Sequence, residues 1–252
     1  MKIKKIFTGY VPRALQKVIH NSLKRFNVLV CHRRFGKTIL VINEMINKGL
    51  ICQHHNPQYA YVAPTYKQAK MIAWEYLIDY TREIPGVKVN KSELSVEILR
   101  QGEKNPDGTW AKKPDKIKFM LLGSDNPDAL RGIYLDGAIL DEYAQCDPII
   151  WGEILRPALS DRVGWAIFIG TPKGQNHFFD RFEKAKDQEA WFSYLIKASE
   201  SGVIPESEID DMKSDMSPEE IDQELECSFH AAVRGSYYGE IINKMENPEG
   251  DN

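Results

Sequence analysis

Residues 31–38 form a short basic segment that ends in glycine, lysine and threonine. An apolar run, 27–31, precedes it, and a helical pattern begins at Thr38. A tight loop between a strand and a helix directs backbone N–H groups and the positive end of the helix dipole toward an anion. Gly36 allows close backbone approach, Lys37 supplies a charge for the β- and γ-phosphates, and the Thr38 hydroxyl can ligate magnesium. The segment therefore predicts a P-loop (Walker A motif) that binds ATP and Mg²⁺.

The loop departs from the usual P-loop pattern at its first position, where Cys31 stands in place of a glycine. A basic surface turn is the alternative interpretation. That alternative does not explain why Arg33 and Arg34 lie directly before Phe35 and the glycine. We therefore favour phosphate binding by this loop.

A second group of chemically useful residues ends the apolar run 137–141, where Asp141 is followed by Glu142. The carboxyl ends of strands in a parallel sheet lie beside the phosphate loop, at the edge where ligands bind. Asp141 is expected to hold the magnesium ion (Walker B motif), and Glu142 is expected to be the base that activates water. In the alternative interpretation, Asp141 caps a turn and Glu142 is merely solvated.

Short apolar runs that alternate with helical patterns must position these groups. We expect strands at 27–31, 58–63, 137–141 and 165–170, and helices at 38–48, 67–82 and 149–159. This alternation indicates a mainly parallel sheet covered by helices on both faces. In the 67–82 helix, apolar and aromatic side chains are assigned to core packing: Ile72, Trp74, Tyr76, Leu77 and Tyr80.

Two regions depart from this alternation. Strands at 93–100 and 116–122 are joined by a connection that contains the turn residues 105–108, which predicts an added antiparallel β-hairpin. After residue 201, the segments 205–215 and 217–227 predict two acidic helices. The carboxylates of the first helix recur at helical spacing and indicate a solvated face, not a metal cluster.

Composition limits the class of protein. The 252 residues suit one large α/β domain or two small ones, and the net charge of −3 means that any contact with DNA must come from a local basic patch. No run of apolar residues is long enough for a transmembrane helix, and the N-terminus lacks the pattern of a secretory signal. Four cysteines without paired spacing argue against a zinc site or a disulfide framework.

Three further segments complete an ordered set of motifs: Tyr10–Gln16, Leu130–Gly132 and Gly170–Gly174. With the glycine-poor loop and the acidic pair, this set resembles the ATPase (motor) domain of the large terminase subunit, which packages DNA in tailed bacteriophages. The resemblance runs from about Tyr10 to Gly239. It implies an α/β P-loop NTPase fold of the ASCE type, with a mainly parallel central sheet flanked by helices and an added antiparallel β-hairpin.

The resemblance also implies roles for particular residues. Gln16 would read the adenine edge, and Arg34, or else Arg33, would contact the γ-phosphate. Arg131 would act as an arginine finger on a neighbouring subunit's nucleotide, and the turn Gly170-Thr171-Pro172 would couple the γ-phosphate to DNA movement. Each has a plainer interpretation. Gln16 can be an ordinary helix residue, Arg131 can pair with Asp128, and the turn can simply end a strand.

The same resemblance implies a division into an ATPase core (1–200), a C-terminal helical part (201–228) and a linker (229–252) toward a nuclease domain. Because such a domain would begin where this chain stops, we expect no nuclease activity. The expected partners are double-stranded DNA, held without sequence specificity through its phosphates, other copies of the chain in a ring on the portal, and the small terminase. The expected location is the cytoplasm of the infected bacterial host.

Candidate DNA contacts are Lys67, Lys70, Lys112, Lys113 and the N-terminal lysines, although each is readily explained as a solvated charge. Two alternative functions remain open. One is a nucleic-acid helicase or remodelling ATPase, which would need a second motor lobe. The other is a nucleotide-gated DNA-binding scaffold with little turnover.

Overall fold

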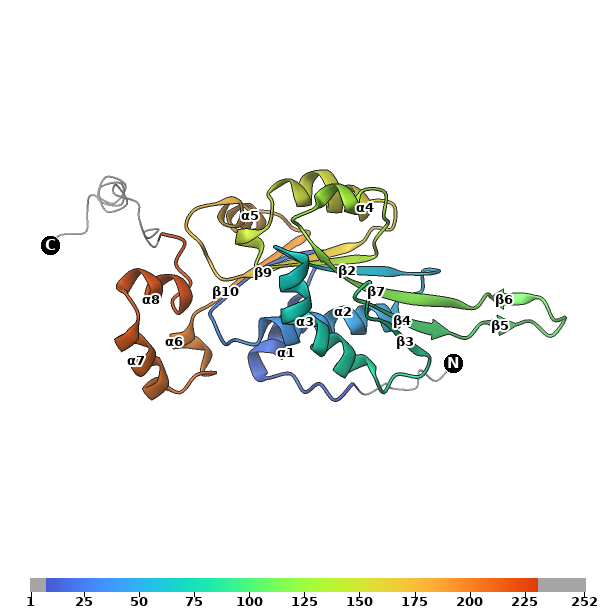
Figure 1. The fold of residues 1–252 in the computed structure, drawn as a ribbon, viewed down its shortest axis with the longest axis horizontal. Coiled ribbons are helices and arrows are strands. Elements are labelled where there is room, and N and C mark those ends of the chain that lie inside the picture. The colour runs from blue at the N-terminus through green and yellow to red at the C-terminus, as the bar shows by residue number, and fades with distance from the viewer. Residues whose placement is uncertain (1–7, 231–252) are drawn as a thin grey trace.

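The structure is a computed structural model that describes residues 8–230, apart from the side chain of Ala129. The N-terminal lysines and the 231–252 part of the linker lie outside the described residues. At the centre is an eight-stranded sheet (Figure 1). In spatial order its strands are β10 (Trp191–Ile196), β1 (Phe26–Cys31), β9 (Trp165–Gly170), β8 (Gly137–Asp141), β2 (Gln58–Ala63), β7 (Asp115–Gly123), β4 (Ser95–Arg100) and β3 (Val87–Asn90).

The first six of these strands pair in parallel, whereas β4 and β3 are antiparallel to their neighbours. The expected strands 58–63, 137–141 and 165–170 are confirmed with the same bounds. β9 lies between β1, which leads into the phosphate loop, and β8, which carries the acidic pair. The position of β9 between these two strands decides which motifs meet at the carboxyl edge of the sheet.

Helices cover both faces of the sheet, which explains why its central strands are continuous apolar runs. Leu29 of β1 packs into a core on one face, and Val28 and Val30 pack into a second core on the other face. On the Leu29 face lie α1 (Ala14–Ser22), α2 (Lys37–Ile51) and α3 (Tyr66–Thr81); on the opposite face lie a π-helix (Ile150–Leu155), α4 (Arg156–Ala158) and α5 (His177–Lys186). The predicted covering of both faces is therefore confirmed.

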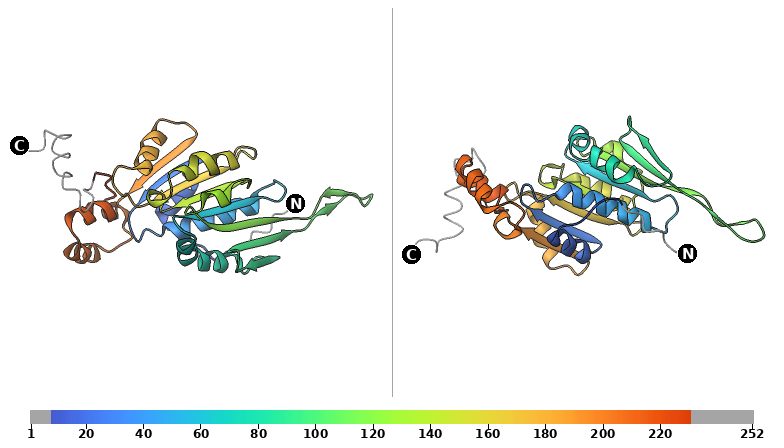
Figure 2. Two further views of the ribbon diagram at one scale, coloured as in Figure 1. Left: turned by 45° about the horizontal axis from the view of Figure 1, so that its top comes forward. Right: turned by 90° about the horizontal axis from the view of Figure 1, so that it is seen from below.

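The expected antiparallel hairpin is also present. β4 pairs with β7, and the connection between them forms a separate ribbon of β5 (Glu103–Lys104) and β6 (Trp110–Lys112). Gly108 has a positive φ of 84° at the ribbon's tight turn, a conformation that glycine adopts without strain. The ribbon projects away from the body of the molecule in all three ribbon views (Figures 1 and 2).

The acidic helices after residue 201 pack on a small core of their own. α6 (Ala198–Ser201), α7 (Glu206–Asp215) and α8 (Pro218–Glu224) surround a cluster of Ala198, Ile204, Ile209 and Leu225. Ser217 and Glu220 form the capping box that begins α8. Within residues 8–230, no helix is both long and apolar enough to cross a membrane.

Candidate nucleotide site at the carboxyl edge of the sheet

The phosphate loop connects β1 to α2, as its position in the sequence predicts. Arg34 and Gly36 have positive φ values of 72° and 86°, which fold the backbone back tightly before α2 begins at Lys37. A side chain at Gly36 would collide with the guanidinium of Arg13. The loop thus needs glycine at this position, and the N-terminus of a fifteen-residue helix follows it directly.

Lys37 is the centre of the site. Its Nζ donates hydrogen bonds to Thr171 Oγ1 at 2.9 Å and to the Cys31 carbonyl at 3.4 Å. The same nitrogen lies 3.9 Å from Glu142 Oε1, and the lysine side chain is only 12% exposed. One largely buried cation therefore joins the loop, the acidic pair and the turn Gly170-Thr171-Pro172, although the chain separates Lys37 from Thr171 by 134 positions.

Asp141 is buried at the end of β8 and is held in a fixed orientation. The Tyr61 hydroxyl donates to its Oδ2, and the Glu142 amide donates to its Oδ1 at 2.9 Å. Burial raises the pKa of Asp141, although the Tyr61 hydrogen bond and the Lys37 charge oppose that shift. The loss of water around the carboxylate is thus not fully offset by its present partners, and a bound cation would stabilise its charged form. Asp141 thus fits the ligand that magnesium prefers.

Glu142 follows with a left-handed backbone, φ 48°, which turns its side chain toward Lys37. Burial raises its pKa, Asp141 adds to the shift, and the charge of Lys37 opposes it. A carboxylate with a raised pKa is a stronger base than a solvated one, as activation of water requires. The geometry therefore places a candidate base, a cation and a candidate metal ligand within one small region.

A cavity of about 230 Å³ lies against these groups. It is lined by Arg34, Phe35, Gly36, Lys37, Thr38, Ile39, Tyr76 and Glu142. Tyr76 was assigned to core packing from the sequence, and this assignment is wrong because its side chain is 39% exposed and faces the cavity. The buried face of α3 follows Ala69, Ala73 and Leu77, so the helical period leaves Tyr76 at the flank.

Gln16 lies beside the phosphate loop, with only 3% of its surface exposed. Its Nε2 donates to the Gly36 carbonyl at 3.3 Å, and its Oε1 accepts from the Arg13 amide at 3.0 Å. Arg13 donates to the Phe35 carbonyl and lies over the Phe35 ring, 5.8 Å from its centroid. The start of α1 thus stabilises the loop through hydrogen bonds to the loop carbonyls. Sequence reasoning did not identify Arg13, and no local pattern distinguishes it from a surface arginine.

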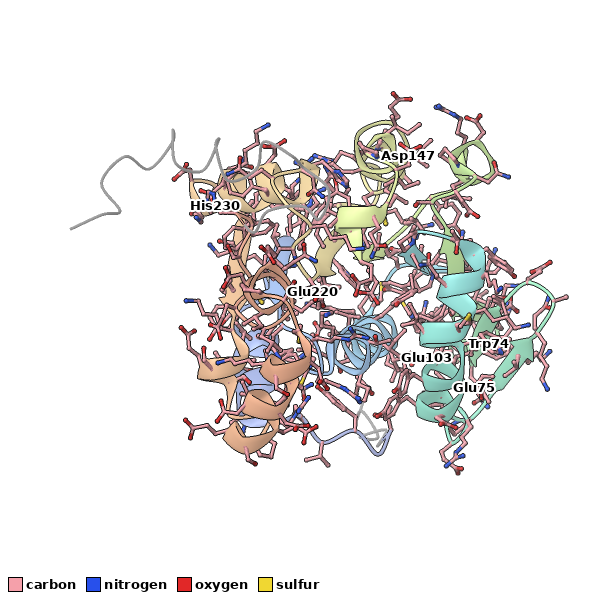
Figure 3. The ribbon with its side chains drawn as sticks, turned by 60° about the vertical axis from the view of Figure 1, so that its left-hand side comes forward. Trp74, Glu75, Glu103, Asp147, Glu220 and His230 are labelled. Carbon is pink, nitrogen blue, oxygen red and sulfur yellow. The ribbon has the colours of Figure 1, made fainter. Side chains whose placement is uncertain are left out.

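A larger cavity, of about 840 Å³, lies between the phosphate loop and the C-terminal helices. Arg13, Arg33 and Arg34 line one side of it, and Glu208, Asp215 and Glu224 are among the residues that line the other side. The Arg33 amide donates to the Glu224 carbonyl at 3.0 Å, so the backbone of α8 contacts the loop directly. In Figure 3, which brings this side forward, the helices around Glu220 lie on the left and α3, with Trp74 and Glu75, lies on the right.

Arg131 is not brought to the site within one chain. Its side chain is 52% exposed, and its guanidinium pairs with Asp128 at 2.8 Å and with Glu153 at 3.3 Å. Neither cavity includes Arg131 among the described residues that line it. This arginine therefore faces outward, available to a neighbouring molecule.

Comparisons with known proteins give consistent results, although no protein-family model matches the chain. The large terminase subunit of Thermus virus P23-45 is 33% identical over 178 residues, which are 69% of this chain and 36% of that protein. The solved ATPase domain of the large terminase of Thermus phage P74-26 has a TM-score of 0.74 and 25% identity, covering 88% of this chain and 95% of that one. The large terminase of another thermophilic bacteriophage, solved in complex with ADP, has a TM-score of 0.66 at 14% identity, covering 82% of this chain and 48% of that one. Since the chain spans about a third of the curated relative's length, the match concerns one part of that protein.

Proposed function

We propose that this chain, which is homologous to the ATPase domain of phage large terminases, hydrolyses ATP to ADP and phosphate and uses the energy to move double-stranded DNA into a procapsid. The contact of Lys37 with both Thr171 and Glu142 carries the proposal. A nucleotide phosphate bound by Lys37 would act on the base and on the coupling turn through a single side chain. The similarity to terminase ATPase domains favours packaging over a helicase function.

Phosphate binding is assigned to the loop. The loop amides and the N-terminus of α2 provide hydrogen-bond donors for the β- and γ-phosphates, and Lys37 provides the charge. Thr38 and Asp141 would hold Mg²⁺, because one supplies a hydroxyl at the helix start and the other a desolvated carboxylate. The ion supplies charge neutralisation for the phosphates when it is bound. Arg34 lines the phosphate cavity and is the better placed of the two loop arginines to contact the γ-phosphate.

Water activation is assigned to Glu142. Its carboxylate accepts a proton from water, the water oxygen bonds to the γ-phosphorus, and the bond to the ADP oxygen breaks. The charge of Lys37, 3.9 Å away, favours the ionised form of this carboxylate and opposes the rise in its pKa. Gln16 is assigned to adenine recognition because it lies beside Gly36. Its side-chain amide can release the Gly36 carbonyl and form a hydrogen bond with the adenine instead.

Assembly into a ring would place Arg131 at a neighbour's nucleotide. Its ion pairs with Asp128 and Glu153 are solvent-exposed and therefore worth little, so they can be exchanged for a phosphate contact. We further propose that DNA is held through its phosphates, with the portal and the small terminase as protein partners and the host cytoplasm as the location. Lys67, Lys70 and Lys113 are exposed and can serve such contacts.

The proposed division into an ATPase core and a helical part near residue 201 is supported by the separate apolar cluster under α6, α7 and α8. The cluster lies beyond the last strand of the sheet, β10, and the helical part contacts the core where the Arg33 amide donates to the Glu224 carbonyl at 3.0 Å. The helical part would thus respond to the loop as a unit.

The decisive experiment separates binding from turnover. In Glu142→Ala, we expect ATP-analogue affinity to stay within a few-fold, while phosphate release falls by roughly 10²–10⁴-fold, the contribution typical of a general base. Glu183→Ala, which removes an exposed carboxylate on α5, is the matched control and should leave both quantities unchanged. Unchanged hydrolysis in Glu142→Ala would overturn the mechanism and favour a nucleotide-gated scaffold.

A mixing experiment tests Arg131. An Arg131→Ala chain should hydrolyse ATP poorly alone, and so should a Glu142→Ala chain. Mixed subunits should regain part of the activity, because one interface then contains an intact base and an intact arginine from the other chain. If no mixture recovers activity while both chains still co-assemble, Arg131 does not act across the interface.

A further inference from the structure

A thiol, an imidazole and a carboxylate converge at the opposite edge of the sheet from the phosphate loop. Cys52 and His54 lie in the connection from α2 to β2, and Asp136 lies directly before β8. The ligand atoms of the three side chains are all within 4.8 Å of one another. His54 Nδ1 and Asp136 Oδ1 are 2.5 Å apart.

We propose that Cys52, His54 and Asp136 bind one divalent transition-metal ion, with zinc as the best fit. Thiolate, imidazole and carboxylate are the three ligand types that zinc accepts, and their mixture disfavours magnesium and calcium, which select oxygen alone. Three protein ligands leave a fourth, tetrahedral position for water. The proposal is independent of the nucleotide site and goes beyond the ATPase function.

The loop that carries the partly buried thiol and the exposed imidazole is already held in place by its neighbours. The Arg100 guanidinium donates to the carbonyls of Cys52 and His54 at 2.5 Å each, and Arg100 is itself held by an ion pair with Asp115. Asp136 is oriented separately, because its Oδ2 accepts the Gln58 amide at 2.9 Å. Because the backbone of Cys52 and His54 and the second carboxylate oxygen of Asp136 are already held in place, these ligands lose little entropy when they bind a metal.

Access and charge also suit a metal. The His54 side chain is 51% exposed, whereas that of Asp136 is 3% exposed, so an ion can enter from the histidine side and reach a buried carboxylate. Tetrahedral zinc keeps its nitrogen and oxygen ligands roughly 3.3 Å apart, so His54 and Asp136 must separate slightly from 2.5 Å while the Cys52 thiol, within 4.8 Å of both, closes on the ion. Arg162 Nη1 lies 3.7 Å from Asp136 Oδ1, farther than a hydrogen bond, so this weak ion pair can give way to a metal ion.

The position gives the metal a structural role. Cys52 follows the end of α2, whose first residue is Lys37, and Asp136 precedes β8, whose last residue is Asp141. A metal at this point would join the far ends of the two elements that carry the phosphate loop and the acidic pair. Zinc should therefore raise the thermal unfolding midpoint of the chain without entering the reaction.

The test uses the whole chain, without nucleotide, and zinc or cobalt chloride as the probe. We expect one zinc per chain after dialysis, and a Co²⁺ complex with thiolate charge-transfer absorption. Cys52→Ser and His54→Gln should each lower zinc affinity by at least about 10-fold and remove the zinc-dependent rise in unfolding temperature. Cys52→Ser should also abolish the thiolate absorption.

The matched control is His55→Gln, which removes the adjacent exposed histidine outside the three-residue cluster. It should bind zinc as the unchanged chain does. The proposal is overturned if the unchanged chain retains no zinc, or if Cys52→Ser and His54→Gln retain it with unchanged affinity, since the ion would then lie elsewhere. Far-UV circular dichroism of each variant confirms that it is folded before binding is compared.

Discussion

Asp115 and Asp141 are both buried aspartates of the parallel part of the central sheet. Asp115 lies where the strands begin and Asp141 lies where they end, so the two carboxylates are at opposite edges of the sheet and have different surroundings. Asp115 begins β7 and forms an ion pair with Arg100, together with a hydrogen bond from the Asn56 amide at 3.1 Å. Asp141 ends β8 and receives hydrogen bonds from Tyr61 and the Glu142 amide, with no arginine among the described residues bonded to it.

The pKa shifts follow this difference. Burial alone would raise the pKa of Asp115, but the hydrogen bonds of Arg100 and Asn56 and the nearby charges hold it below its ordinary value. At Asp141, burial dominates and the pKa is raised. A carboxylate that is neutralised within its own chain stabilises the fold, whereas one left with excess charge is suited to an incoming cation. On this basis we call the side of the sheet at Asp115 the structural edge, and we propose that the side at Asp141 is the reactive edge.

The largest expected effect is on the reactive edge. Asp141→Asn keeps the shape of the side chain but removes its charge, and we expect hydrolysis to fall on the order of 10³-fold, about 4 kcal/mol of transition-state stabilisation. Unfolding free energy should not fall, because a desolvated charge is removed. Phosphate release and urea unfolding measure the two effects, and a destabilised yet active variant would invalidate the comparison.

The complementary change is on the structural edge. Arg100→Ala leaves Asp115 buried without its cation, and we expect a loss of about 3 kcal/mol of unfolding free energy. Hydrolysis per folded molecule should stay unchanged. Arg82→Ala, which removes an exposed arginine that forms only surface ion pairs, is the control and should change stability by less than about 0.5 kcal/mol. Urea unfolding followed by circular dichroism provides the measurement, and equal stability of the two variants would contradict the assignment.

The two edges should also respond oppositely to acid in the chain free of metal and nucleotide. Asp141 and Glu142 have folded pKa values above their ordinary values of 3.8 and 4.5, so the chain gains stability as pH falls through the raised values. Asp115 has a folded pKa below 3.8, so its contribution is present above that pH and is lost only as pH falls further.

Urea unfolding at pH 7 and pH 5 tests this sign. The gain in unfolding free energy on acidification should be larger for the unchanged chain than for the Asp141→Asn, Glu142→Gln double variant, in which neither group titrates. Equal gains in the two proteins would show that this edge carries no excess charge.

The smallest expected effect concerns the orientation of Asp141. Tyr61→Phe removes one buried hydrogen bond, and we expect hydrolysis to fall by up to about 10-fold, with about 1 kcal/mol of stability lost. Tyr59→Phe is a matched control, because Tyr59 is equally buried on the same face of β2 but its hydroxyl contacts the Lys48 carbonyl at 3.4 Å. If both variants lose the same activity, the contact with Asp141 does not position the carboxylate.

Much of the fold could be predicted because the central strands are buried on both faces. Apart from Gln58 at the start of β2 and Asp141 at the end of β8, the strands β2, β8 and β9 are apolar runs, and their bounds are predicted to the residue. β10, α1 and α5 were not predicted. In β10, five of the six side chains are only partly buried, which weakens the apolar signal. β3 is mostly exposed, which weakens its signal in the same way. An edge strand takes its structure from its neighbour in the sheet more than from its own pattern.

The amino-acid sequence alone specifies the local chemistry: a loop that needs glycine, a lysine at a helix start, and two carboxylates at the end of a buried strand. Which distant groups meet is established by the tertiary structure. β9 lies between β1 and β8 and brings Thr171 to Lys37 across 134 positions. The structure likewise sets Arg13 behind the loop, turns Tyr76 toward the cavity, and joins Asp136 to His54 across 82 positions. Local periodicity specifies which side chains are buried, but strand order and crossovers, which depend on the whole core, specify their neighbours.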